Sequence, residues 1–391
     1  MVFTAYPENV KHIAKSHFSD YPKGAVLKNI LSDFFGNGNV NADGDNWKFQ
    51  RQILRHEFNP TSLHIFQRFA FDTICKKAFG YDPSYLSPSL EETEFAGAFA
   101  NANKITSERV GHVIPLVWKL KRFLNIGSGK ILKQAIATIR ESIRKIVRQK
   151  KHELKEKYFL EATDDLISRI VKDNNLDEEL VIDIAINFIV GGQDTISAAL
   201  TWFFWLVSSN PEVEIEILKE IKQTAEEPGY EDLKDMVYIH ASLCETMRLY
   251  PPVPVESKEA AGDDILPDGT IIKKGMMVLY SSYAMGRMEN LWGPDWNVFK
   301  PGRWLERKNV TGKSSFVGKD PYTYPVFHAG PRICLGKELG FLEMKMVAVE
   351  ILRRFKVVPA ANGDDSAPVF VSYGTAKMKG GFPIKIEKRT T

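Results

Sequence analysis

The apolar run from Ile184 to Val207 constrains the fold of this 391-residue chain most, because Asp194 is its only charged residue. A run of this length must leave water, either in a lipid bilayer or in the core of a large domain. A carboxylate near its centre would cost about 3 kcal/mol in lipid, and charged segments continue the helical pattern on both sides. The sequence therefore favours a buried core helix, with a membrane span as the alternative.

Two adjacent glycines, Gly191 and Gly192, stand in the middle of this run and are followed closely by Asp194 and Thr195. A glycine costs about 1 kcal/mol in a helix interior, so a pair of them indicates a purpose. Without side chains there, another body can approach the helix closely. A kinked helix with close packing is the alternative, but it explains the Asp-Thr pair less well.

The composition is that of a globular protein, with 44% hydrophobic and 26% charged residues, enough for one large core or two to three domains. A net charge of +3 without a dense basic stripe predicts no nucleic-acid binding but permits a basic docking face.

The three cysteines, Cys75, Cys244 and Cys334, are too few and too scattered for a disulfide framework or a zinc ribbon. The absence of a disulfide framework indicates a reducing compartment. The N-terminal segment resembles neither a signal peptide nor a membrane anchor.

Hydrophobic periodicity predicts a mostly α chain with a smaller β portion late in the sequence, an α+β class. Amphipathic helices are expected at 138–158 and 230–250, and short strands at 263–285 and from 355 onward. One more helix is predicted to start at about residue 335. Its apolar stripe is Leu335, Leu339, Leu342, Met346 and Val349.

A cysteine stands just before that last helix, in the stretch FHAGPRICLG at 327–336. Gly330 and Gly336 bracket Cys334 and permit close approach of another body. The helix N-terminus and the nearby Arg332 both favour the thiolate form. A buried structural cysteine is the alternative.

The pattern Phe327-x-x-Gly330-x-Arg332-x-Cys334-x-Gly336 resembles the haem-binding loop of the cytochrome P-450 family. The resemblance implies that Cys334 is the axial ligand of the iron of haem b, and a thiolate ligand favours O–O cleavage. It also implies that Phe327 packs on the sulfur side and that Arg332 pairs with a haem propionate.

Three further stretches agree with this family. Glu245 and Arg248 form its E-x-x-R motif, whose buried network also takes an arginine from a later Pro-x-Arg segment, here Arg303. The family usually has Glu where this chain has Gly302, so the loop is expected to be held less firmly. Trp47 and Arg51 resemble the W-x-x-x-R pair that holds a propionate; a partly buried Trp with a solvated Arg is the alternative.

The Gly-Gly-x-Asp-Thr stretch at 191–195 is the third stretch that agrees with this family. It resembles the family's distal helix, where Gly191 and Gly192 open space for dioxygen, and Asp194 and Thr195 deliver protons and hold water.

The subfamily resemblance is to plant fatty-acid ω-hydroxylases and jasmonoyl-amino-acid hydroxylases, carried by HEFNPTSL, FAFDTICKKAFGYDP, AMGRMENLWGPDW and AGPRICLGKELGFLEMK. It implies insertion of one oxygen atom into a C–H bond of an apolar substrate, near the end of a fatty acyl chain. Plain core packing is the alternative for the residues expected to line the substrate pocket. These are Phe34, Phe35, Phe188, Val253 and Val255.

The resemblance covers residues 1–391 as one P-450 domain, with a helical part at about 1–252, strand-rich parts at 253–285 and 355–391, and the haem loop at 327–336. The start resembles the family's second helix, so the anchor, the first helix and the first two strands are expected to be absent. HEFNPTSLHIF runs almost directly into QRFAFDTICKKAFG, so one internal helix is also expected to be missing.

Electrons are expected from a separate NADPH-dependent flavoprotein reductase, because the chain has no flavin domain and no G-x-G-x-x-G site. The candidate docking residues, with a solvated surface as the alternative, are Lys48, Arg55, Lys337 and Lys345.

The resemblance implies the cytosolic face of the endoplasmic reticulum membrane, although a chain without the anchor is compatible with a soluble protein. Residues 113–126 have a composition that suits contact with a membrane surface, and equally an ordinary amphipathic helix. Two other functions stay open: a non-catalytic haem-binding remnant, and a thiol enzyme that uses Cys334 with His328 as base.

Overall fold

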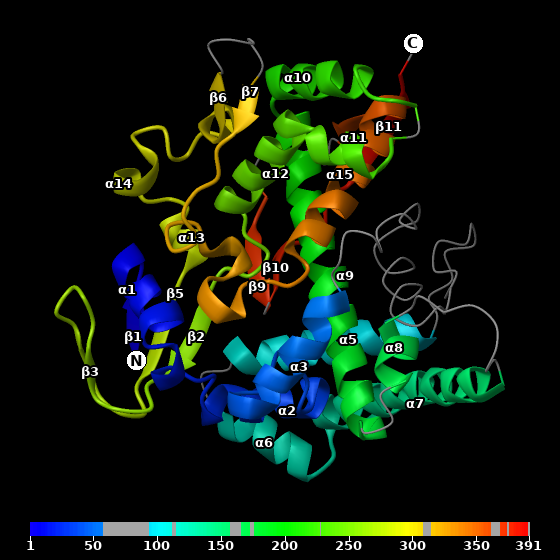
Figure 1. The fold of residues 1–391 in the computed structure, drawn as a ribbon, viewed down its shortest axis with the longest axis vertical. Coiled ribbons are helices and arrows are strands. Elements are labelled where there is room, and N and C mark those ends of the chain that lie inside the picture. Colours follow the sequence, from blue (N-terminus) through cyan, green and yellow to red (C-terminus); the bar gives the residue numbers. More distant parts are fainter. Residues whose placement is uncertain are drawn as a thin grey trace. The chain divides into compact units, whose positions relative to one another are not determined.

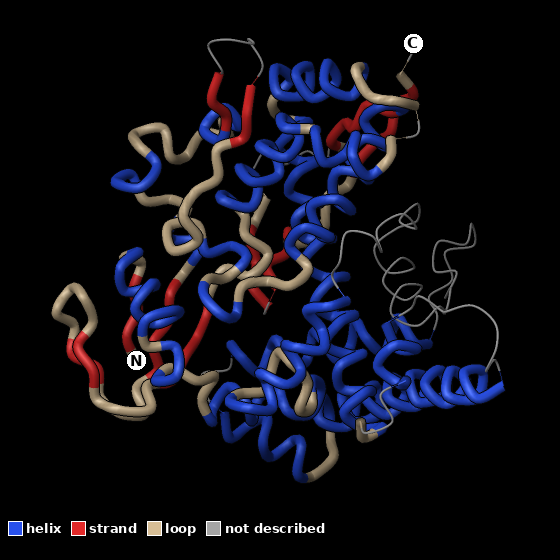
Figure 2. The backbone as a smooth tube through the Cα atoms, in the orientation of Figure 1, coloured by secondary structure: helices blue, strands red, loops and turns tan. Residues whose placement is uncertain are grey.

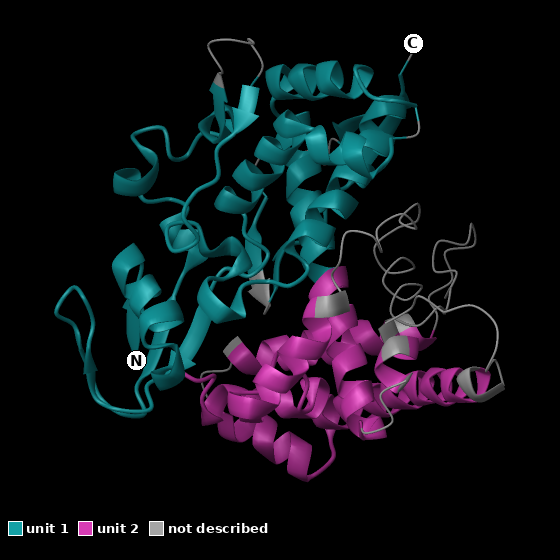
Figure 3. Ribbon diagram, viewed as in Figure 1, with its two compact units in different colours: residues 1–21, 63–65, 194–391 teal, residues 22–62, 66–193 magenta. Residues whose placement is uncertain are grey.

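Figure 1 shows the computed structural model of the chain. It describes residues 1–57, 94–111, 115–156, 166–172, 176–226, 228–307, 314–360, 368–373 and 375–389. The chain divides into two compact units, coloured in Figure 3. The first unit consists mainly of residues 1–21 and 194–391, and the second mainly of 22–62 and 66–193.

The described part of the second unit is helical, as the blue tubes of Figure 2 show. Its helices are α2 (Ala25–Phe35), α3 (Gly44–Glu57), α5 (Glu94–Gly111), α6 (Pro115–Phe123), α7 (Gly127–Glu156), α8 (Leu166–Lys172) and the first half of α9 (Glu178–Ser208). Helix α7 packs against α5, α6 and α8. Its buried stripe, at steps of three and four residues, is Leu132, Ala135, Ile139, Ile143 and Val147. The amphipathic helix predicted at 138–158 is thus part of α7.

The first unit combines helices with most of the β structure. Its helices are α1 (Pro7–Lys11), the second half of α9, α10 (Pro211–Lys222), α11 (Tyr230–Asp235), α12 (Val237–Leu249), α13 (Ser282–Met285), α14 (Glu289–Trp292) and α15 (Lys337–Arg354). Shorter turns are the π-turn η1 (His12–Ser16) and the 3-10 turns η2 (Phe18–Asp20), η4 (Pro301–Trp304), η5 (Pro325–Phe327) and η6 (Gly330–Arg332). Residues 241–249 of α12 are all buried, so α12 is the central helix of this unit.

The largest sheet in the described part has the strand order β1-β5-β2, formed by Val2–Thr4, Met277–Tyr280 and Glu256–Glu259. Strand β1 is parallel to β5, and β2 is antiparallel to it. The two-stranded pairs are β3 (Asp264–Ile265) with β4 (Ile271–Ile272), β6 (Leu305–Arg307) with β7 (Ser314–Phe316), β8 (Phe355–Pro359) with β11 (Ile384–Lys388), and β9 (Phe370–Tyr373) with β10 (Thr375–Met378). The mostly α prediction with a smaller β portion is confirmed.

Two details differ from the prediction. The chain begins with a strand, in which Val2 pairs with Val278, ahead of the helix that its start was expected to form. A helix starts only at Pro7, whose fixed φ suits a first helical position. The point at which an internal helix was expected to be missing, between residues 66 and 67, falls in residues 58–93, outside the described residues.

The buried face of α15 is the second difference. Phe341, Met344 and Ala348 are buried, whereas Leu339, Leu342 and Met346 of the predicted stripe are only half-buried. Both faces of this helix carry apolar side chains, so periodicity alone could not decide between them.

Helix α9 runs unbroken through Gly191 and Gly192. It is long and apolar enough to cross a membrane, yet half of its most apolar window is buried inside the protein. It also carries buried polar side chains that bind the segment after α2. The Asp183 carboxylate accepts a hydrogen bond from the Asn37 backbone at 2.7 Å, and Asn187 Oδ1 accepts one from the Val40 backbone at 2.9 Å. These contacts are those of a core helix.

Candidate functional site

The Cys334 loop lies in the first unit, between η5 and α15. The backbone N–H of Cys334 donates to the carbonyl of Phe327 at 2.8 Å and closes the loop. Gly330 adopts φ +65°, and a Cβ there would lie 1.9 Å from the carbonyl oxygen of Ala14, so only glycine fits. The Cys334 side chain is exposed, which excludes the alternative of a buried structural cysteine.

The aromatic and basic residues of this loop have defined neighbours. The Phe327 ring lies 5.1 Å from the ring of Phe341 on α15, and Lys337 Nζ lies 5.9 Å from the Phe327 centroid. The Arg332 guanidinium lies 5.9 Å from the Phe18 ring. Helix α15 begins at Lys337 with Gly336 at its N-cap, so Cys334 precedes the first helical turn. An exposed thiol just before a helix N-terminus, with Arg332 and Lys337 close in the sequence, fits the donor that a haem-thiolate centre requires.

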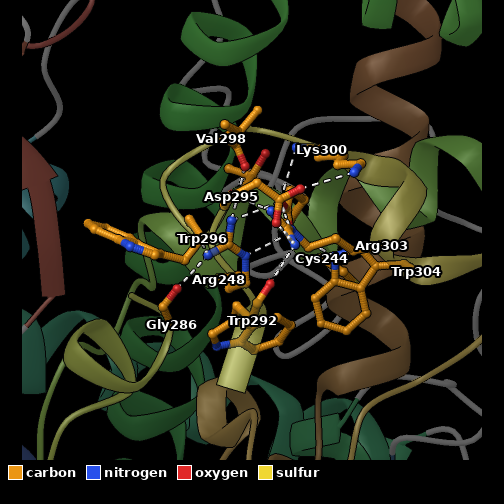
Figure 4. A network of polar contacts seen from close by, with 12 residues as sticks. Cys244, Arg248, Gly286, Trp292, Asp295, Trp296, Val298, Lys300, Arg303 and Trp304 are labelled. Atoms are coloured by element: carbon orange, nitrogen blue, oxygen red, sulfur yellow. Dashed lines mark hydrogen bonds and ion pairs between the residues drawn. The ribbon is translucent and has the colours of Figure 1, made fainter. Parts of the chain in front are cut away.

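The E-x-x-R pair forms the buried charge network drawn in Figure 4. Glu245 and Arg248 have no exposed side-chain surface, and Arg248 Nη2 lies 2.8 Å from Glu245 Oε1. Arg248 Nε also donates to Glu245 Oε2 at 2.8 Å. The same guanidinium donates to the backbone carbonyls of Gly286, Trp296 and Val298. A buried charge is tolerated only when it is paired in this way.

Arg303 joins this network, as the sequence predicted. Its Nε lies 3.1 Å from Glu245 Oε1, and its Nη1 donates to the Trp292 carbonyl at 2.7 Å. It also pairs with Asp295 at 2.7 Å. Hydrogen bonds from Arg303, the larger cause, and from Lys300 lower the pKa of Asp295 to about 2.

Two further donors to Glu245 were missed by the sequence reasoning. Trp304 Nε1 donates to Oε2 at 2.9 Å, and the Lys300 backbone N–H donates to Oε1 at 3.0 Å. Both flank Arg303 in FKPGRWL, so a search of the segment around Arg303 for buried donors would have found Trp304. A Cβ at Gly302 would meet no described atom within 4 Å, and Glu245 itself fixes the loop on both sides of this glycine.

The Gly-Gly-x-Asp-Thr stretch occupies the middle of α9. No described atom lies within 4 Å of a Cβ built on Gly191, and the helix is not broken there, so close packing at a kink does not explain this glycine. In the first unit, Asp194 Oδ1 forms an ion pair with Lys377 Nζ of β10 at 3.3 Å. Sequence reasoning missed this lysine, because it lies 183 residues from Asp194 along the chain. Thr195 is half-buried beside Asp194.

The remaining predicted residues of the second unit lie on three helices. On α3, Trp47 is buried and Arg51, one turn later, is half-buried. Phe34 on α2 has no exposed surface, and its ring lies 5.9 Å from that of Phe99 on α5, so the core interpretation holds for Phe34. Phe35 is also buried, and Phe188 on α9 is half-buried. In the first unit, Val253 and Val255 lie in the segment between α12 and β2, with Val255 exposed.

The cytochrome P450 family model matches residues 57–370. The chain belongs to the cytochrome P450 family. It is 49% identical to cytochrome P450 94A1 of Vicia sativa, over 99% of this chain and 82% of that protein. It is 51% identical to cytochrome P450 94A2 of the same plant, over 100% of this chain and 82% of that protein. It is 43% identical to cytochrome P450 94B1 of Arabidopsis thaliana, over 99% of this chain and 82% of that protein.

These matches confirm the predicted family, its fold and its activity. The protein is a haem-thiolate monooxygenase that takes electrons from a redox partner and acts on apolar substrates. The comparisons do not favour a non-catalytic remnant, and a haem-free thiol enzyme is excluded by the family. The alignment with 94A1 spans 421 positions, more than the 391 residues of this P450, so the relative contains residues without a counterpart here.

The basic residues that were predicted to dock a redox partner are not all on the surface of this P450. Lys345 is only 3% exposed, and its Nζ donates to the carbonyls of Leu233 at 2.7 Å and Lys234 at 3.1 Å. Burial lowers the pKa of Lys345 to about 8. Its assignment to a docking face is therefore wrong, since it binds the last carbonyls of α11 instead. Lys48 and Arg55 are exposed, and Lys337 is half-buried.

Proposed function

We propose that Cys334 is the thiolate ligand of haem b in this P450. Of the two cysteines in the described residues, Cys334 is exposed, whereas Cys244 is 3% exposed. Burial raises the pKa of the Cys244 thiol and so disfavours its thiolate. When bound, the haem supplies oxygen activation, and a thiolate ligand favours cleavage of the O–O bond. The exposed thiol in its closed loop is the observation that carries this proposal.

The loop and its neighbours would then hold the haem. Phe327, whose ring lies against Phe341, is the proposed neighbour of the Cys334 sulfur. Gly330 and Gly336 allow close approach at the loop, and Arg332 is the proposed partner of a propionate through a charge-assisted bond. On α3, Trp47 and Arg51 stay the predicted partners of a propionate.

A reduced, CO-treated absorption spectrum tests the ligand directly. The wild-type chain supplied with haem is expected to show a strongly red-shifted Soret band, and Cys334→Ala is expected to lose it. Cys244→Ala is the matched control and should keep the band. A band that survives Cys334→Ala would disprove the assignment, and Cys75, outside the described residues, would be the next candidate.

Asp194 and Thr195 are proposed to deliver the protons that reduction of dioxygen consumes. Asp194 has a partner, Lys377, whose Nζ lies 3.3 Å from Asp194 Oδ1 and orients this carboxylate. Thr195 follows it directly on α9, where a hydroxyl can hold water. Gly191 and Gly192 stay the predicted opening for dioxygen. Thr195→Ala is expected to raise electron consumption per product formed; unchanged coupling would contradict this role.

The proposed reaction inserts one oxygen atom into a C–H bond near the end of a fatty acyl chain. The subfamily motifs and the identity to the cytochrome P450 94 proteins support this substrate class. Phe35, Phe188, Val253 and Val255 stay the predicted apolar lining, whereas Phe34 lies in the core. Product analysis with a set of fatty acids and with jasmonoyl-isoleucine separates the two subfamily alternatives. Oxidation of neither would contradict both.

The proposed electron donor is a separate NADPH-dependent flavoprotein reductase, for which Lys48, Arg55 and Lys337 remain docking candidates. Charge reversal at Lys48 and Arg55 is expected to slow reduction by this donor, and more strongly at low ionic strength. An unchanged rate at low salt would rule these two residues out.

Helix α6 is the proposed membrane contact. It exposes Leu116 (71%), Leu120 (53%) and Phe123 (85%), while Lys121 and Arg122 provide basic charge on the same helix. An apolar face flanked by basic residues is typical of helices that lie in a membrane interface. A site on the cytosolic face of the endoplasmic reticulum membrane agrees with this surface. Leu120→Ser with Phe123→Ser is expected to reduce binding to anionic lipid vesicles, and undiminished binding would overturn the proposal.

A further inference from the structure

Two histidines stack on each other in the π-turn η1 near the start of the chain. The His17 N–H donates to the His12 carbonyl at 2.9 Å, the five-residue spacing of a π-turn. Residues five apart then lie above each other, and the two imidazole rings stack at 4.0 Å with 19° between their planes. Such turns occur often at functional sites.

A carboxylate from β3 meets this histidine pair. Asp264 Oδ2 lies 2.7 Å from His12 Nε2. One ligand atom each from His12, His17 and Asp264 all lie within 4.8 Å of one another. We call these three residues the His-His-Asp cluster. All three belong to the first unit, and none was singled out by the sequence analysis.

The cluster is oriented by a surrounding layer of hydrogen bonds. The buried Tyr21 donates its hydroxyl to Asp264 Oδ2 at 2.7 Å, and the Ile265 backbone donates to Oδ1 at 2.7 Å. Asp20 Oδ2 lies 3.2 Å from His17 Nδ1. In metal sites, a ligating histidine is oriented by a carboxylate that binds its second ring nitrogen. A ligating carboxylate is oriented by hydrogen-bond donors.

We propose that the His-His-Asp cluster binds a Zn²⁺ ion. Two imidazole nitrogens and one carboxylate oxygen are ligands that Zn²⁺ takes, with the fourth tetrahedral position left to water. Ca²⁺ and Mg²⁺ prefer sites made of oxygen ligands alone. A simple ion pair accounts for His12 and Asp264, but it does not account for His17, which stacks on His12 and has Asp20 at its Nδ1. His17 is half-exposed, so its ring can turn the short distance that a tetrahedral site demands.

The cluster also bears on the Cys334 loop. Ala14, in the middle of η1, places its carbonyl against Gly330 so closely that no Cβ fits between them. Phe18, which follows His17, lies under the Arg332 guanidinium. A metal that fixes η1 would therefore stabilise the surface on which this loop rests. This consequence rests on the proposed role of Cys334, whereas binding of the metal itself does not.

Calorimetric titration of Zn²⁺ into the full-length, haem-loaded, chelator-washed protein tests the proposal. One Zn²⁺ per chain is expected, with binding weakened at least ~10-fold in His17→Ala and in Asp264→Asn. Asp263→Asn is the matched control, because the adjacent Asp263 is exposed and pairs with Lys273 at 2.8 Å. It should bind Zn²⁺ like the wild type.

The outcomes are distinguishable. No binding, or affinity that is unchanged in His17→Ala, would overturn the proposal and would assign any bound Zn²⁺ to other side chains. His17 is half-exposed, so this variant keeps the test decisive even if Asp264→Asn does not fold. X-ray absorption at the zinc edge should show two imidazoles and one carboxylate. As a second readout, Zn²⁺ should slow the loss of the reduced-CO Soret band in the wild type but not in His17→Ala. If Cys334 does not bind the haem, this second readout is lost, but the calorimetric result still stands.

Discussion

The first unit contains two acid–base groupings that use their carboxylates in opposite ways. Glu245 is fully buried and accepts hydrogen bonds from Arg248, Arg303, Trp304 and the Lys300 backbone. Asp194 is partly exposed, and its ion pair is with the half-exposed Lys377. A carboxylate that is surrounded by donors and closed to water is held in one position. One that has solvent access can contact water molecules, so the first arrangement stabilises the fold and the second suits the proposed proton delivery.

Glu245→Gln is the strongest test of this contrast. It keeps the side-chain shape but leaves the buried Arg248 guanidinium without its counter-charge, while Arg303 keeps its ion pair with Asp295. We therefore expect a loss of about 3–5 kcal/mol in the free energy of unfolding. Denaturant unfolding measures this loss. Glu231→Gln is the control, because Glu231 forms an exposed pair with Lys234 at 3.4 Å and should change stability by less than about 1 kcal/mol. An equal loss of unfolding free energy in the two variants would show that burial of the Glu245 network does not increase its contribution to stability.

Trp304→Phe probes the donor that the sequence did not reveal. The change removes the Nε1–H bond to Glu245 Oε2 and part of a buried side chain, so we expect a loss of about 1–3 kcal/mol. Thermal unfolding of the haem-loaded protein is the measurement. The double variant with Glu245→Gln should lose less than the sum of the two single changes, because both act on one contact. Simple additivity would argue that Trp304 only fills space.

His240 on α12 is a third ionisable group; it is half-buried, and no carboxylate pairs with it in the described residues. Burial, and to a lesser extent Lys345 and Lys337, lower the pKa of His240 from 6.5 to about 3. The unfolded chain therefore binds a proton below pH 6.5 that the folded protein does not, and stability falls as the pH drops from about 6.5 toward 3.

The expected size is about 1.4 kcal/mol at one pH unit below 6.5. His240→Phe, which keeps a ring stacked on Phe341, should remove this part of the acid sensitivity. Urea unfolding at pH 7.5 and 5.5 gives the comparison. An identical pH dependence in both proteins would show that His240 is protonated in the fold.

Lys377→Met should have the smallest effect on stability, less than about 1 kcal/mol, because the pair with Asp194 is partly exposed. Its expected effect is on turnover: without the cation that orients the Asp194 carboxylate, electron consumption per product formed should rise. The exposed Lys379→Met is the control in the same strand region. A large stability loss with unchanged electron consumption per product would place Lys377 with the Glu245 network instead.

Several parts of this protein were predictable because their signals are local. The loop around Cys334, the pair Glu245 and Arg248 one helical turn apart, and the periodic stripe of α7 each depend on residues near one another in the chain. Spacing within one helix determines which side chains share a face, so periodicity indicated the fold class. The short motifs carried the resemblance that indicated the family.

Other features depended on contacts between distant segments. Lys377 reaches Asp194 across 183 residues, and Val2 pairs with Val278 in a parallel strand. Lys345 looked like a surface charge in the sequence, yet it is buried under α11. His12 and His17 meet only because a π-turn, not an α-helix, brings them into one stack.

The sequence alone therefore determined that this protein is a helical haem-thiolate enzyme with an E-x-x-R network, because those signals lie in short spacings. The tertiary structure alone decided which charges are buried, which carboxylate each cation meets and where η1 supports the Cys334 loop. The reason is physical: burial and pairing depend on how whole helices and strands pack, and the same lysine or histidine is compatible with many packings until one is formed.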